Sequence, residues 1–85
     1  MSELMKICED IEKVFKENNW SWVYGIPDKV QIYDMILNLQ DSLDEETDMV
    51  SSGRITLIKS EDGYSICLDF GDFIGGEFVR SFSDE

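Results

Sequence analysis

The feature that most constrains the fold is a change in hydrophobic period near residue 50. Over residues 2–18 the apolar positions recur every three or four residues, at Leu4, Ile7, Cys8, Ile11, Val14 and Phe15. This spacing predicts an amphipathic helix. Beyond residue 52 the apolar positions alternate with polar ones, as in a strand that is buried on one side. A chain that passes from the first pattern to the second is expected to fold as an α+β domain.

A second helix is predicted from residue 28 to about residue 44. Asp28 and Gln31 have the spacing of a capping box, and Pro27 stands just before them. The helix has a broad apolar face, which Val30 and Leu37 widen, so we expect it to be in contact on two sides. Between the helices, residues 20–26 are rich in aromatic side chains and are predicted to be a short strand or an extended connector.

Three strands are predicted in the second half of the chain. The first runs through Ile55 and Leu57 and ends at the turn signal Glu61-Asp62-Gly63. The return strand covers residues 64–70, and Gly75-Gly76 marks a turn before a last strand at residues 77–82. The prediction is one domain, residues 1–85, in which two N-terminal helices pack on a three-stranded antiparallel meander in the order α-α-β-β-β. Its expected core comprises Ile11, Phe15, Ile32, Ile36, Leu39, Ile55, Leu57, Ile66 and Leu68.

The charge of the chain excludes several functions. There are 19 Asp and Glu against 7 Lys and Arg, which gives a net charge of −12, and there is no His. Direct binding to nucleic acid or to an anionic membrane is disfavoured, because phosphate contacts need basic side chains. The commonest general base and metal ligand is missing, and no nucleophile–base pair or ligand cluster is visible. We therefore expect no enzyme, no catalytic residues, no metal and no cofactor.

The two cysteines, Cys8 and Cys67, are too few and too far apart for a disulfide scaffold. Both stand among apolar residues and are expected to be buried or half-buried thiols. The N-terminus has no basic segment followed by an apolar run, so no secretory signal is predicted and the expected location is cytoplasmic.

Two groups of residues are candidates for partner binding. The first consists of carboxylates on the second helix and in the segment after it: Asp34, Asp41, Asp44, Glu45, Glu46 and Asp48. Acids at a helix C-terminus oppose the helix dipole, so this cluster is either a solvated loop or a contact surface for a basic protein. The second group is Trp20 and Trp22, which either complete the core or anchor a partner.

By type, the chain resembles small acidic inhibitors encoded by phages and prophages, some of which are nucleic-acid mimics or act against CRISPR and restriction systems. The resemblance rests on length, a charge of −12, the lack of catalytic residues and the α-α-β-β-β order. It implies inhibition of a nuclease or other nucleic-acid-binding effector through its basic surface. Two alternatives stay open: an immunity protein or antitoxin against a basic nuclease toxin, and a small structural or regulatory subunit that forms a homodimer or larger oligomer.

Overall fold

The computed structural model describes residues 2–71 and 78–83. Its elements are the helices α1 (Glu3–Glu17) and α2 (Lys29–Asp41) and the strands β1 (Met49–Ser52), β2 (Ile55–Ser60), β3 (Gly63–Leu68) and β4 (Val79–Ser83). The chain divides into two compact units, Met1–Leu37 and Asn38–Glu85, and their boundary falls within α2. The α+β class is confirmed. Packing of the helices on one face of the sheet stays a prediction.

The helix ends in the first unit follow the sequence signals. The Ser2 hydroxyl accepts from the Met5 amide at 3.0 Å, and Asn19, just past α1, has a φ of 54°. The capping box of α2 is present in both directions. Asp28 Oδ1 accepts from the Gln31 amide at 2.9 Å, and Gln31 Oε1 accepts from the Asp28 amide at 3.0 Å.

Two carboxylates of α1 bind the first residue of α2. Glu12 Oε2 accepts a hydrogen bond from the Lys29 amide at 3.0 Å, and Glu9 Oε1 lies 3.6 Å from Lys29 Nζ. The first contact places a negative charge at the N-terminus of a helix, where the unpaired amides and the helix dipole favour it. These contacts tie the beginning of α2 to the middle of α1 within the first unit.

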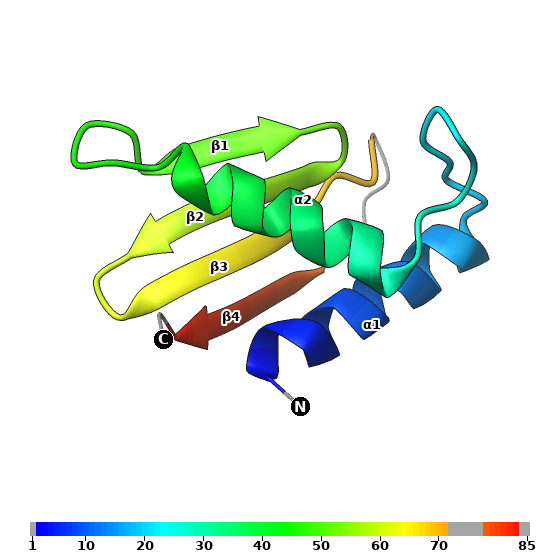
Figure 1. Cartoon of the computed structure of the whole chain (residues 1–85), viewed down its shortest axis with the longest axis horizontal. Coiled ribbons are helices and arrows are strands. Elements are labelled where there is room, and N and C mark those ends of the chain that lie inside the picture. Colours follow the sequence, from blue (N-terminus) through cyan, green and yellow to red (C-terminus); the bar gives the residue numbers. More distant parts are fainter. Residues whose placement is uncertain (1, 72–77, 84–85) are drawn as a thin grey trace. The chain divides into compact units, whose positions relative to one another are not determined.

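The sheet corrects the predicted three-stranded meander, because it has four antiparallel strands in the order β1-β2-β3-β4 (Figure 1). The additional strand is β1, which pairs with β2 from Met49↔Ile58 to Ser52↔Ile55. It was missed because it is short, contains two serines and follows a run of acids, so it has no alternating apolar pattern. Gly53, with a φ of 58°, occupies the first position of the two-residue turn into β2, a glycine position typical of tight hairpins.

The expected core is confirmed, since all nine predicted residues are buried. Leu4, Ile7, Cys8, Tyr64, Phe78 and Phe82 are also buried. Burial on α2 is narrower than predicted, because Val30 and Leu37 are 55% and 37% exposed. The turn predicted at Gly75-Gly76 and the start of the predicted last strand, residue 77, lie outside the described residues.

Candidate functional site

The predicted acidic loop has a defined backbone conformation that is set by its first acid. Asp44 Oδ1 accepts hydrogen bonds from the amides of Thr47, at 2.7 Å, and Glu46, at 2.8 Å. These two bonds, from Thr47 first and Glu46 second, lower the pKa of the Asp44 carboxyl below its ordinary value. The Asp44 amide donates to the Thr47 carbonyl at 3.1 Å, which closes the turn. Asp44 therefore holds the loop, while the side chains of Glu45 and Glu46 are exposed on it.

The antiparallel order of the sheet brings two further acids, Glu61 and Asp62, to the end of the sheet where the Asp44 loop lies. β1 begins where β2 finishes, and the Lys59 amide donates to the Asp48 carbonyl at 2.7 Å. The turn that joins β2 to β3 carries Glu61 and Asp62, both exposed. The loop before β1 and this turn lie at one end of the sheet (Figure 1). We name this group the acidic end; it comprises Asp44, Glu45, Glu46, Asp48, Glu61 and Asp62.

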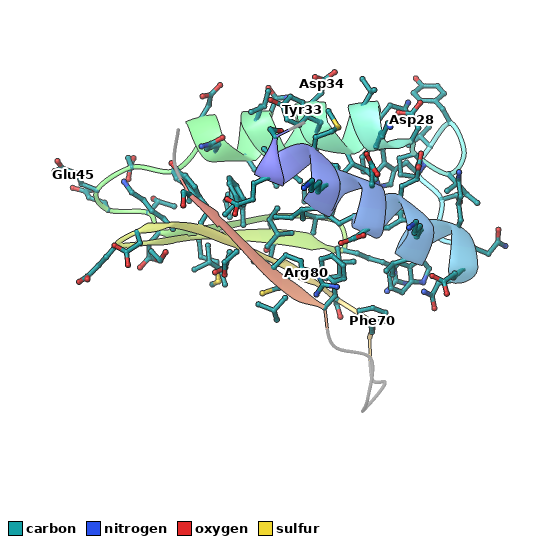
Figure 2. All side chains as sticks on the ribbon, turned by 90° about the horizontal axis from the view of Figure 1, so that it is seen from below. Asp28, Tyr33, Asp34, Glu45, Phe70 and Arg80 are labelled. Carbon is teal, nitrogen blue, oxygen red and sulfur yellow. The ribbon has the colours of Figure 1, made fainter. Side chains whose placement is uncertain are left out.

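One base accompanies the acidic end in the described part of the second unit. Lys59 precedes the β2–β3 turn, and its charge is a minor contributor to the lowered pKa of Asp44. Glu45 lies at the tip of the loop (Figure 2). Glu61 and Asp62 were not among the predicted site residues. The sequence could have indicated them through the predicted turn at 61–63. A turn that ends one strand lies at the same end of an antiparallel sheet as the segment that enters the neighbouring strand.

The predicted carboxylates on α2 are exposed, but they fall in different units. Asp41 is the last residue of α2 and belongs to the second unit, three residues before Asp44. Asp34 belongs to the first unit and extends from α2 into solvent (Figure 2). The structure thus gathers Asp44, Glu45, Glu46 and Asp48 around one loop, whereas Asp34 belongs to the other unit.

The two predicted tryptophans support a tight turn in the first unit. Both indole rings meet the buried Phe15 ring edge-on, with ring centroids 5.4 Å apart for Trp20 and 6.2 Å for Trp22. Trp22 and Gly25 exchange backbone hydrogen bonds of 2.8 and 3.2 Å, and between them stand Val23 and Tyr24. The segment predicted as a strand or connector therefore contains a two-residue hairpin turn, and its two indole rings are half-buried.

The most exposed large apolar residues of the described chain are at the tip of that turn. Val23 is 89% exposed and Tyr24 is 96% exposed. Gly25 has a φ of 113°, a conformation that side-chain-bearing residues rarely adopt, which explains a glycine at the end of the turn. The signal for this arrangement in the sequence was the glycine three residues after Trp22, whereas the alternation of aromatic residues predicted a short strand or an extended connector.

The described residues include two free thiols and no metal-binding cluster. Cys8 is buried, which raises the pKa of its thiol to about 12, and Cys67 is half-buried; neither is in a disulfide. Among residues 2–71 and 78–83, no group of three or more Cys, Asp and Glu has a geometry that could hold a metal ion. No helix within these ranges is long and apolar enough to cross a bilayer.

Comparison with protein-family models, with curated protein sequences and with solved structures finds no match to this chain.

Proposed function

We propose that this protein is a non-enzymatic inhibitor that binds the basic surface of a nucleic-acid-binding effector, such as a nuclease, and so keeps nucleic acid from it. The observation that carries the proposal is the acidic end, where two segments of the chain bring six exposed carboxylates together beside Lys59. Closely spaced carboxylates on a supported loop can match a row of Lys and Arg that normally binds phosphates. Association would be fast and steered by charge.

Asp44 determines how the proposal should be tested. Because its carboxylate caps the loop through Glu46 and Thr47, replacing Asp44 would alter the backbone as well as the charge. Reversal of Glu45 and Glu46 to Lys leaves those capping bonds in place. The matched control is Glu3→Lys with Glu17→Lys at the two ends of α1, where the effects on the helix dipole oppose each other. Both double variants change the net charge from −12 to −8.

Binding is measured against nucleases of the same genome, with labelled DNA as competitor. We expect the wild-type protein to displace DNA from its target and to show no binding to DNA itself. Glu45→Lys with Glu46→Lys should slow association by about tenfold or more, whereas the α1 control should retain most of the rate. Raising salt from about 50 to about 500 mM should weaken binding, because the Debye length falls from roughly 14 to about 4 Å. If neither the Glu45→Lys, Glu46→Lys reversal nor the added salt changes binding to the target, an electrostatic contact is refuted.

A second candidate function follows from the exposed turn tip. Val23 and Tyr24 project from a turn that is supported by Trp20 and Trp22, as expected of an apolar anchor in a fixed subunit or partner complex. In that case Tyr24→Ala should abolish binding through faster dissociation, with little dependence on salt. Tyr24→Phe, which keeps the ring, is its control. An immunity protein or antitoxin would use the same electrostatic contact as the inhibitor. It would differ in that a toxin gene lies beside the gene for this protein.

A further inference from the structure

The outer edge of β1 presents backbone groups that point away from the rest of the sheet. β1 is an outer strand, and among the described residues it pairs with β2 alone. In an antiparallel pair, residues that exchange hydrogen bonds alternate with residues whose amide and carbonyl point away from the neighbour. The Lys59 amide donates to the Asp48 carbonyl at 2.7 Å, which makes these two a hydrogen-bonded pair. Continuing the register from that pair, the amides and carbonyls of Met49 and Ser51 point to the outer edge.

A side-chain contact agrees with this orientation of the β1 backbone. Ser51 lies opposite Thr56 of β2, and their hydroxyl oxygens are 2.8 Å apart. Side chains of opposite residues come closer in pairs that do not exchange backbone hydrogen bonds. The hydroxyl contact therefore indicates that the Ser51 amide and carbonyl are directed away from β2. Both Met49 and Ser51 are exposed.

β1 lacks the residues that usually keep another strand from an open edge. Outer strands are commonly protected by a charged side chain, a proline or a bulge. The sequence of β1, MVSS, contains no charged residue and no proline, and its register with β2 is continuous. The other outer strand, β4, carries the exposed Arg80, whose Cζ lies 4.3 Å from the centroid of the Phe78 ring. β1 is therefore the edge with fewer obstacles to strand addition, although its four residues allow only a short ladder.

The uncharged edge of β1 begins at the acidic end. Asp48 directly precedes β1, and the loop before it carries the exposed Glu45 and Glu46. The β2–β3 turn, which contributes the remaining two acids of the acidic end, lies at the same end of the sheet (Figure 1). A strand added beside β1 would therefore have one of its ends next to these carboxylates.

We propose that β1 binds an extended segment of the partner protein as an additional antiparallel strand, with Lys or Arg side chains of that segment beside the acidic end. This inference rests on the proposed function for the nature of the partner, and it adds how the partner is recognised. The outward amides and carbonyls of Met49 and Ser51 select an extended backbone, and the carboxylates select its charge. A second copy of this chain is a poor occupant, because two chains with a charge of −12 each repel one another.

A synthetic peptide provides the probe for strand addition. The peptide TVTVKKK, acetylated at its N-terminus and amidated at its C-terminus, would place its lysines at the acidic end when it pairs antiparallel with β1. In the control peptide every amide of the TVTV part is methylated, which removes the hydrogen-bond donors and keeps the side chains and the charge. Calorimetry in about 50 mM NaCl, where charges are weakly screened, should show that the unmodified peptide binds about tenfold or more tightly than the control.

Hydrogen exchange at single amides of β1 reports whether its edge is paired. In the free protein the outward amides of Met49 and Ser51 should exchange faster than the amide of Val50, which faces β2 opposite Leu57. Saturation with TVTVKKK should slow exchange at Met49 and Ser51 about tenfold or more, and saturation with the methylated peptide should not.

Proline on β1 tests the same contact from the side of the protein. An outer strand tolerates proline where the lost amide faces outward. Ser51→Pro should weaken binding of TVTVKKK about tenfold or more, whereas Ser51→Ala, which removes the same hydroxyl, should bind as wild type does. Should Ser51→Pro fail to fold, Met49→Pro at the first residue of β1, with Met49→Ala as its control, provides the same test.

These measurements separate strand addition from the proposed function. Equal binding of the two peptides, unchanged exchange at Met49 and Ser51, or equal binding by the Pro and Ala variants would each overturn strand addition. The acidic end could then still bind a nuclease by charge alone, as its own charge-reversal test shows. Conversely, proline-sensitive binding of TVTVKKK by a protein that displaces DNA from no nuclease would support strand addition and overturn the inhibitor. Slower exchange at Met49 and Ser51 on concentrating the protein without peptide would overturn the proposal in favour of a second copy.

Discussion

Gly63 stands at a position where the neighbouring backbone leaves no room for a side chain. It begins β3 opposite Ser83 of β4, and a Cβ at this position would collide with the carbonyl oxygen of Phe82. Its φ of 153° adds conformational strain for any other residue. The close approach of the two strands therefore depends on the absence of a side chain.

We expect Gly63→Ala to lower the free energy of unfolding by about 1–3 kcal/mol, the usual cost of forcing extra atoms into a packed site. Gly53→Ala is the control: Gly53 also has a positive φ, but a Cβ there meets nothing within 4 Å. Urea denaturation of both variants separates collision from backbone strain. Equal losses in the two variants would mean that β4 moves aside at little cost.

At the scale of elements, the first turn of α2 is stabilised by the reciprocal bonds of Asp28 and Gln31 and by the carboxylate of Glu12 at the Lys29 amide. Asp28, labelled in Figure 2, is exposed, so its side chain acts through the helix end rather than through the core. We expect Asp28→Ala to cost about 1 kcal/mol in the free energy of unfolding, as loss of an N-cap usually does.

Asp28→Asn separates capping from charge, because an amide oxygen can still accept from the Gln31 amide. This variant should retain most of the stability measured by urea denaturation. A loss as large as that of Asp28→Ala would assign the effect to the negative charge at the N-terminus of α2.

Elements with a complete local signal were predictable, and those that depend on partners were not. α1 and α2 have apolar periodicity and caps, and β2 and β3 alternate around an Asp-Gly turn, so their existence followed from the sequence. β1 has four residues without alternation and exists through its pairing with β2, which no local pattern encodes. The apolar Val30 and Leu37 widened the predicted face of α2, but composition does not tell which apolar residues a neighbour covers.

Most residues of the candidate site could be predicted from the sequence, but their roles could not. The acidic loop was visible as a run of carboxylates, and Trp20 and Trp22 were visible as large aromatics. Their roles depend on conformation, which composition does not encode: Asp44 caps the loop through hydrogen bonds to residues two and three positions along the chain. The tryptophans pack against Phe15 and support a turn that exposes Tyr24. Glu61 and Asp62 belong to the acidic end because β1 pairs antiparallel with β2, so that the start of β1 lies beside the β2–β3 turn.

At the scale of the whole molecule, the net charge of −12 should make the fold itself sensitive to salt. Like charges repel in the compact state more than in the expanded unfolded chain, and screening removes part of that difference. We expect the melting temperature to rise between about 50 and about 500 mM NaCl, over which the Debye length falls from roughly 14 to about 4 Å. Sodium chloride is preferable to sulfate, which also strengthens apolar burial.

One variant tests the cause of that rise in the melting temperature. Glu45→Lys with Glu46→Lys has a net charge of −8, so its melting temperature should increase less with salt than that of wild type. An equal increase in both proteins would show that repulsion at the acidic end does not limit the fold, and that its carboxylates can gather beside β1 without a cost in stability. Salt would then act on this molecule through the proposed association alone, by weakening contact between the acidic end and a basic partner.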